Sequence, residues 1–252
     1  MSELFAHYPS LEGRHIFITG GATGIGASLV RHFHQQYAIV SFLDIAKEHG
    51  EQLVAELGER AFFYECDLRD IDSLRRVIAT AIETVGPIGV LINNAARDDR
   101  HAIQDVSSED WDRCQEINLK PHFFTAQAVV EGMKSLGGGS IINVSSNSYI
   151  LMVGGMPGYL TAKAGIMGLT RALARDLGVN GIRVNCILPG WVMTRRQEEL
   201  WLTEEAEKDL LESQCLKQKL YPPDVSRLAL FLASDDSHMI TAQAYTVDGG
   251  RS

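Results

Sequence analysis

Short apolar runs rich in β-forming residues alternate along the whole chain with longer segments of helical periodicity. The runs span 16–18, 38–43, 61–64, 90–92, 141–144, 184–188 and 245–247. Strands buried on both faces appear as continuous apolar runs, and parallel neighbours need a crossover connection, usually a helix. Each run corresponds to one strand, so the pattern predicts an α/β fold with one doubly wound parallel sheet of seven strands and helices on both faces.

Helical periodicity is clearest between the first two runs. Ile25, Leu29, Phe33 and Tyr37 recur every four residues, which places one apolar stripe on a helix packed against the sheet. Further helices are expected over 71–85, 117–133, 164–177 and 225–232. Because no Pro-rich linker, repeat or low-complexity tract interrupts the series, we expect residues 1–252 to form a single domain.

The least regular stretch is 191–220. It contains Trp191 and Trp201 and a dense run of charges over 198–212. An insertion near the carboxyl ends of strands is a common place for a lid over a substrate, so this segment is predicted to be one. A solvated amphipathic helix is the alternative interpretation.

Composition and charge narrow the classes of protein. A hydrophobic content of 45% favours a folded domain. The formal net charge of -9 without a basic cluster argues against nucleic acid or an anionic membrane as a partner. The first fifteen residues lack the apolar core of a signal peptide, and no later segment is long enough to span a bilayer. We therefore expect a cytoplasmic protein.

The four cysteines are far apart in the sequence. Cys66, Cys114, Cys186 and Cys215 form no C-x-x-C pair and have no histidine at ligand spacing. Free thiols are therefore expected, with neither disulfides nor a metal site.

A glycine-rich turn, Thr19 to Gly26, follows the first predicted strand and precedes the first predicted helix. Glycines there let backbone N–H groups close on a pyrophosphate at a helix N-terminus. Leu29 stands where the general G-x-G-x-x-G fingerprint has its third glycine, so that motif is not strictly met. The placement between strand and helix still indicates a dinucleotide site.

Asp44, at the end of the second predicted strand, suggests which dinucleotide binds. A carboxylate here can accept hydrogen bonds from the adenosine ribose and repels a 2′-phosphate, and Ile45 and Ala46 supply no arginine to hold one. NAD is therefore favoured over NADP. An Asp that caps a helix is the alternative, and one residue can do both.

Tyr159 and Lys163 are four residues apart and so share one face of a predicted helix. A phenol has a pKa of about 10, but a positive charge about 4 Å away contributes about 4 kcal/mol at an effective dielectric of about 20. That equals about three pKa units, so the sequence predicts a phenol that exchanges protons near neutral pH.

These features together resemble the short-chain dehydrogenase/reductase family. The turn 19–26 resembles its T-G-x-x-x-G-x-G, residues 93–96 its N-N-A-G with Ala96 in place of glycine, 159–163 its Y-x-x-x-K, and 189–190 its P-G. The motifs occur in the family's order over nearly the whole chain. The resemblance implies a Rossmann-type fold and hydride exchange between an alcohol or carbonyl carbon and a nicotinamide.

The resemblance also implies roles for individual residues. The catalytic set it implies is Asn118, Ser146, Tyr159 and Lys163, with Ser146 hydrogen-bonded to the reacting oxygen and Asn118 holding a water in a relay from Lys163. Ser145 and Ser148 are neighbouring competitors for Ser146, and a local backbone bond is the alternative role of Asn118. The implied NAD contacts are Gly20, Thr23, Gly24, Ile25, Gly26, Asp44, Asp67, Leu68, Asn94, Ala95, Tyr159, Lys163, Pro189, Gly190, Val192 and Thr194.

Polar runs near this site suggest the substrate. Residues 98–101, 196–198 and 214–217 resemble those of bacterial aldose 1-dehydrogenases, which implies oxidation of an anomeric hydroxyl to a lactone. The substrate contacts expected are Ser146, Asn147, Ser148, Tyr159, Arg100, His101 and Gln197. Solvated loops or subunit contacts are the alternative for these polar residues.

Two other activities stay open on the sequence alone. One is a different oxidoreductase of the same family, such as a polyol or secondary-alcohol dehydrogenase or a 3-oxoacyl reductase; the other is a non-catalytic NAD-binding sensor. The resemblance further implies a homotetramer or homodimer formed through the helices that contain Ile117 and Ala164.

Overall fold

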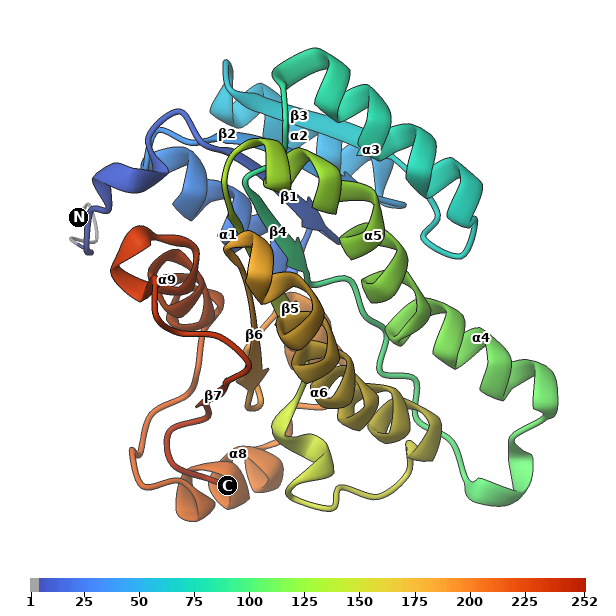
Figure 1. Cartoon of the computed structure of the whole chain (residues 1–252). Coiled ribbons are helices and arrows are strands. Elements are labelled where there is room, and N and C mark those ends of the chain that lie inside the picture. The colour runs from blue at the N-terminus through green and yellow to red at the C-terminus, as the bar shows by residue number, and fades with distance from the viewer. Residues whose placement is uncertain (1–4) are drawn as a thin grey trace.

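A seven-stranded, wholly parallel sheet forms the centre of the protein (Figure 1) in a computed structural model that describes residues 5–252. The strand order is β3-β2-β1-β4-β5-β6-β7. The strands are β1 His15–Thr19, β2 Ile39–Asp44, β3 Ala61–Glu65, β4 Val90–Asn93, β5 Gly139–Val144, β6 Ile182–Pro189 and β7 Ala244–Val247. All seven predicted strands are confirmed, with ends shifted by at most two residues.

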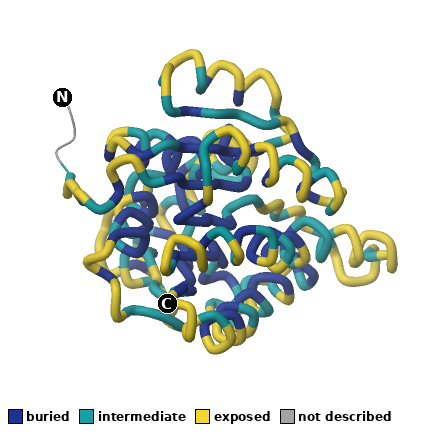
Figure 2. Tube along the Cα trace, turned by 45° about the horizontal axis from the view of Figure 1, so that its top comes forward, coloured by how far each residue is buried: buried dark blue, intermediate teal, exposed yellow. Residues whose placement is uncertain are grey.

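Helices cover both faces of the sheet. They are α1 Gly24–Gln35, α2 Lys47–Leu57, α3 Ile71–Val85, α4 Ser108–Asn118, α5 Lys120–Ser135, α6 Pro157–Leu177, α7 Arg195–Leu200, α8 Glu204–Ser213 and α9 Pro222–Ala233. Ile16 and Ile18 of β1 belong to the core that α1 and α9 close, whereas Phe17 belongs to the opposite core beneath α3, α5 and α6. Because successive strand residues face opposite sides, the continuous apolar run follows directly. Figure 2 shows the buried trace enclosed by exposed outer segments.

The first helix ends two residues before its apolar stripe does. α1 ends at Gln35, and Tyr37 adopts a φ of 61° with 57% of its surface exposed. Tyr37 therefore turns the chain toward β2 instead of packing on the sheet. The prediction that Tyr37 continues the buried stripe is wrong, because a residue with positive φ cannot extend a right-handed helix.

The helix predicted over 117–133 corresponds to α5, and its first two residues are the end of α4, which the prediction missed over 108–116. α4 ends at Asn118 and α5 begins at Lys120, with Leu119 between them at φ -132° and ψ -54°. The amide of His122 bonds to the carbonyl of Leu119 at 3.1 Å, so the hydrogen-bond ladder restarts after the break. Pro121 in the first turn of α5 fits this restart, since proline is tolerated where no N–H partner is needed.

Two helices occupy the segment predicted as a lid. α7 and α8 lie within 191–220, and the single bridge between Val192 and Leu220 joins the two ends of this segment. α2, which begins at Lys47 three residues after Asp44, is also missing from the prediction. No helix among residues 5–252 is long and apolar enough to cross a membrane.

Candidate active site

A cleft of about 990 Å³ opens at the carboxyl ends of the strands. β1 has β2 on one side and β4 on the other, so the chain reverses its direction across the sheet here, which is where open α/β sheets bind ligands. The predicted site residues that line the cleft are Gly20, Thr23, Gly24, Ile25, Gly26, Asp44, Asp67, Leu68, Asn94, Ala95, Arg100, Ser146, Asn147, Ser148, Tyr159, Lys163, Pro189, Gly190, Val192, Thr194 and Gln197. Asn118 and His101 are the two predicted residues outside this lining.

The glycine-rich turn fits a phosphate group closely. Gly24 has a φ of 54°, which favours glycine, and Thr23 begins α1 without a side-chain capping bond. A Cβ on Gly26 would lie 1.7 Å from the carbonyl oxygen of Gly20, so only glycine permits this approach of helix and turn. The departure at Leu29 from the general fingerprint does not alter this cradle, since Leu29 is wholly buried in the core.

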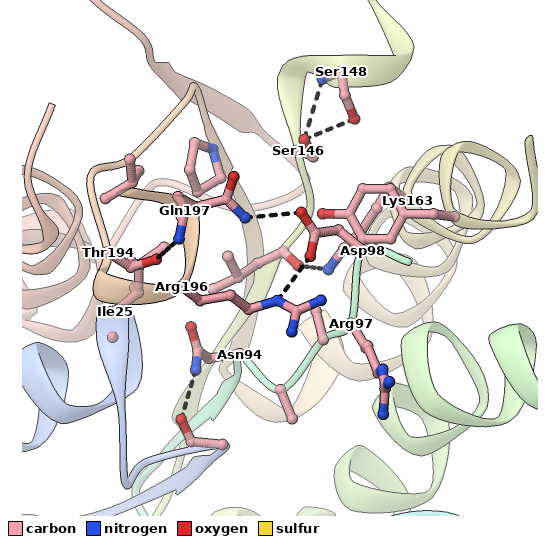
Figure 3. Close-up of a pocket in the computed structure, with 18 of the residues that line it drawn as sticks. Ile25, Asn94, Arg97, Asp98, Ser146, Ser148, Lys163, Thr194, Arg196 and Gln197 are labelled. Atoms are coloured by element: carbon pink, nitrogen blue, oxygen red, sulfur yellow. Dashed lines mark hydrogen bonds and ion pairs between the residues drawn. The ribbon is translucent and has the colours of Figure 1, made fainter. Parts of the chain in front are cut away.

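Asn94 braces the turn from the neighbouring strand. Its side-chain amide donates to the carbonyl oxygens of Thr19 at 3.1 Å and Gly20 at 3.0 Å. The hydroxyl of Thr19 accepts from the backbone amides of Asn94 and Ala95 at 3.0 and 3.1 Å. The side chain of Asn94, labelled in Figure 3, thus holds the turn in shape. The contact with a ribose that the resemblance implies for Asn94 stays a prediction.

The Asp44 carboxylate joins the turn to the start of α2. Its oxygens accept from the backbone amides of Ala22 and Ala46, each at 3.0 Å. The N-cap of α2 is Ala46 and not Asp44, so the alternative that Asp44 caps this helix is wrong. A carboxylate has about four acceptor positions, which leaves capacity for ribose hydroxyls beside the two amides. The ribose contact of Asp44 stays a prediction.

Asp67 and Leu68 form the far wall, where the adenine is expected. Leu68 is buried, and the pKa of Asp67 is lowered because Arg69 hydrogen-bonds its side chain. A purine ring needs apolar surface with a few polar groups at its edge, and this wall supplies both. The residues present therefore fit an adenine dinucleotide along the whole of the cleft's nucleotide half.

Tyr159 and Lys163 stand on α6, four residues apart, at the other end of the cleft. Lys163 is 1% exposed; its ammonium lies 5.6 Å from the centre of the Tyr159 ring and donates to the carbonyl of Val144 at 2.9 Å. Burial lowers the pKa of Lys163 to about 8. The helix and the shared face that the spacing predicted are both present.

The pKa of Tyr159 differs from the sequence prediction. Burial raises it above the ordinary value, the Asp98 carboxylate raises it further, and a hydrogen bond with Ser146 acts against both. The predicted fall toward neutral is therefore wrong for the protein without ligands. The lysine charge lies against the face of the ring and bonds to Val144, so it does not pair with the phenol oxygen.

Ser146 is the serine best placed beside Tyr159. Its hydroxyl donates to the hydroxyl of Ser148 at 2.8 Å and accepts from the Ser148 amide at 3.1 Å. Ser145 is turned away, since its hydroxyl donates to the backbone carbonyl of Lys163 at 2.6 Å. The preference for Ser146 over Ser145 agrees with this geometry, and Ser148 joins the same small cluster.

Asn118 binds backbone, as the alternative interpretation expected. Its amide donates to the carbonyls of Cys114 and Arg97 at 3.0 and 3.1 Å, and its oxygen accepts from the amide of Arg97 at 2.8 Å. These bonds anchor the loop that follows β4 to the end of α4. The relay water stays a prediction.

His122, which no sequence motif singled out, lies beneath Lys163. It is 2% exposed, and neither ring nitrogen has a hydrogen-bond partner of ordinary geometry among residues 5–252. Burial, and next the charge of Lys163, lower the pKa of His122 to about 3, although the carbonyl of Val144 favours its protonated form. The ring is thus neutral, and Lys163 carries the only charge of this buried pair.

Side chains of the loop after β4 and of α7 contact each other across the mouth of the cleft (Figure 3). The Asp98 carboxylate accepts from the side-chain amide of Gln197 at 2.8 Å and lies 3.4 Å from Nε of Arg196. Beside them, the guanidinium of Arg100 lies 4.0 Å from the ring centre of Trp201. Segment 191–220 therefore contacts the loop after β4 at the Tyr159 end of the cleft, and its role as a lid stays a prediction.

Two predicted substrate residues differ in how their side chains are engaged. The side-chain amide of Asn147 donates to Asp248 at 2.9 Å. His101 donates its backbone amide to the carbonyl of Gly155 at 2.7 Å, whereas its buried Nε2 has no hydrogen-bond partner among residues 5–252. Asp98 was absent from the predicted contacts although it lies in the polar run; its position just after the carboxyl end of β4 is the signal that would have selected it. No group of residues within 5–252 is arranged to hold a metal ion.

Comparison with a family model and with known proteins agrees with this geometry. Residues 20–252 match the family model described as "Enoyl-(Acyl carrier protein) reductase". A protein of Rhizobium meliloti named "Probable galactose dehydrogenase GalD" is 47% identical, with 97% of each chain covered. The D-xylose 1-dehydrogenase of Caulobacter vibrioides is 46% identical, with 97% of this chain and 98% of that one covered.

A solved structure extends the likeness to three dimensions. A short-chain type dehydrogenase/reductase from Mycobacterium ulcerans superposes with a TM-score of 0.91 at 25% sequence identity. The match covers 96% of this chain and 90% of that one. The likeness of fold therefore extends over nearly the whole chain.

Proposed function

Because this chain belongs to the short-chain dehydrogenase/reductase family, we propose that it is an NAD-dependent aldose 1-dehydrogenase, which oxidises the anomeric hydroxyl of a sugar to the lactone. The observation that carries the proposal is the position of Tyr159 and Ser146. They lie on one wall of the cleft, directly beneath the polar cover made by Asp98 and Gln197. Relatives named as galactose and D-xylose dehydrogenases support the substrate class.

The chain's own residues supply binding and proton transfer. The turn 20–26 would hold the pyrophosphate of a nicotinamide dinucleotide, and Asp44 the adenosine ribose, where its charge disfavours the 2′-phosphate of NADP. When bound, this cofactor supplies the acceptor for hydride. Alignment of that ring with the sugar carbon is the contribution of the protein.

Tyr159 is the base in this proposal. Its hydroxyl takes the proton of the anomeric hydroxyl, and Ser146 steadies the same oxygen by a hydrogen bond. Lys163 keeps a positive charge under the ring, where it favours the phenolate form once the proton has left.

The test is a panel of aldoses, polyols and an acetoacetyl thioester, each assayed with NAD and with NADP. We expect turnover of an aldose with NAD, and Tyr159→Phe should lower kcat by a factor of about 10²–10⁴ while NADH still binds. Activity on the thioester alone would end the sugar assignment, and no turnover of any substrate would favour a sensor. Unchanged kcat in Tyr159→Phe would overturn the role of this phenol. The homotetramer or homodimer stays a prediction.

A further inference from the structure

Asp98 lies where the catalytic wall meets the lid. Its side chain is 20% exposed, and it lines the cleft between Tyr159 and α7. Figure 3 shows the carboxylate turned toward Gln197, on the same side of the cleft as Lys163. The residue is anchored from behind, since Asn118 bonds both backbone polar groups of its neighbour Arg97. Its position is therefore set by the fold and not by the lid alone.

The carboxylate has spare acceptor capacity. Oδ2 accepts from Gln197 at 2.8 Å, and the 3.4 Å contact of Oδ1 with Arg196 is long, with an arginine side chain that is 48% exposed. A carboxylate offers about four acceptor positions and no donor. Two partners leave acceptor positions for further donors, and Asp98 lines the cleft, where a ligand can supply them.

The charge of Asp98 also reaches the catalytic pair. It raises the pKa of Tyr159 and of Lys163, and Cys114 of α4 acts in the same direction on both. Ser146 is the group that favours the ionised phenol by hydrogen bonding. A ligand that hydrogen-bonds the Asp98 carboxylate would disperse part of this charge at the moment when Tyr159 must lose its proton.

We propose that Asp98 is a specificity-determining residue of this site, whose carboxylate accepts hydrogen bonds from substrate hydroxyls beside the reacting carbon. This inference rests on the proposed function. A sugar presents such donors, whereas a simple alcohol or an acyl thioester presents none beside its reacting carbon. The carboxylate therefore binds a sugar through hydrogen bonds and is left without these partners by the other two classes. In this proposal Gln197 holds the Asp98 side chain in place, and Asp98 contacts the sugar.

The charge on Asp98 gives a second, independent readout in the pH dependence. Asp98→Asn removes a negative charge that raises the pKa of Tyr159. The pKa of the phenol should therefore fall, and the rise of kcat with pH during oxidation should move to lower pH. Titratable or charged groups that face these residues are Lys163 and Cys114 around Tyr159, and Arg196 at Asp98. All three remain in the variant.

Asp99→Asn is the matched control. Asp99 carries the same charge one residue along, lies 3.4 Å from the same Arg196, and pairs with Arg97 at 2.6 Å. It is not among the groups that shift the pKa of Tyr159. Asp98→Asn and Asp99→Asn thus both remove one negative charge from the loop and one contact with Arg196. In the proposal, only Asp98→Asn also removes a contact with the substrate.

The experiment measures kcat/KM for an accepted aldose and its 2-deoxy analogue in wild type, Asp98→Asn, Asp98→Glu and Asp99→Asn. Asp98→Asn should lose about 10- to 100-fold with the aldose but only about threefold with the deoxy sugar. Asp98→Glu should keep most of the discrimination, and Asp99→Asn should lie within about threefold of wild type on both. NADH affinity reports whether each variant is folded.

The outcomes separate the two claims. Equal losses on both sugars in Asp98→Asn, or an unmoved pH profile, would overturn the role of Asp98 while leaving an aldose dehydrogenase in place. A wild-type protein that oxidises no aldose would overturn the proposed function and this inference with it. A selective loss on the hydroxylated sugar together with the acid shift of the profile is the expected result.

Discussion

The two halves of the cleft are held in shape by different parts of the chain. The nucleotide half depends on backbone: the approach of Gly26 to the carbonyl of Gly20, braced by Asn94. The substrate half depends on side chains that meet across 99 residues of sequence, as Asp98 and Gln197 do. A backbone cradle cannot adjust to a substitution, whereas a side-chain bridge can be remade, so mutations in the two halves should differ in size and in kind.

The largest effect is expected at Gly26 in the nucleotide half. Gly26→Ala places a Cβ 1.7 Å from the carbonyl oxygen of Gly20, so the turn or the helix must move. We expect the free energy of unfolding to fall by about 1–3 kcal/mol and the Kd for NADH to rise by about 100-fold or more. Urea denaturation and fluorescence titration measure the two quantities.

Gly168→Ala is the control for this substitution. Gly168 lies in the interior of α6, where an added Cβ meets nothing within 4 Å. Alanine is favoured over glycine in a helix by about 1 kcal/mol, so this variant should be more stable and bind NADH normally. Near-normal NADH binding by Gly26→Ala would show that the cradle adjusts, and the contrast between the two halves would fail.

A smaller effect is expected at the adenosine end. Asp44→Asn keeps the size of the side chain but removes its charge and one of the acceptors that hold Ala22 and Ala46. Repulsion of a 2′-phosphate is lost, so the ratio of kcat/KM for NAD over NADP should fall by about 10- to 100-fold. Asp67→Asn, whose parent residue is already paired with Arg69, is the control. An unchanged ratio would contradict the role of Asp44.

The contrast between the two halves also explains which features the sequence could predict. The sheet and the nucleotide half follow from local signals, because apolar runs define strands and the turn 19–26 lies between one strand and one helix. The exceptions are local too: the positive φ of Tyr37 and the break at Leu119 interrupt otherwise regular patterns. For the missed helix α4, the unused signal was the capping box that Ser107 forms with Asp110 at its start.

The substrate half was only partly predictable. The polar runs 98–101 and 196–198 are visible in the sequence, but which of their side chains pair is decided by how segment 191–220 packs against the loop after β4. The prediction of a lowered pKa for Tyr159 failed for the same reason. Residue spacing shows which helix face Lys163 shares with Tyr159, but not where its ammonium group points. Burial, which dominates that pKa, is a property of the whole fold.

The smallest effect should come from the lid itself, where Trp201 stacks on Arg100 at 4.0 Å. Trp201→Leu keeps an apolar side chain but loses the cation–π contact, which at partly exposed sites is worth about 0.5–1 kcal/mol. The KM for the sugar should rise by about two- to fivefold while the Kd for NADH stays the same, and Trp201→Phe, which keeps a ring, should lie between the variant and wild type. Steady-state kinetics and NADH titration measure the two constants separately. A parallel loss of NADH affinity would mean that the lid contacts also shape the nucleotide half, since a side-chain bridge that served only the substrate would leave that backbone cradle unaltered.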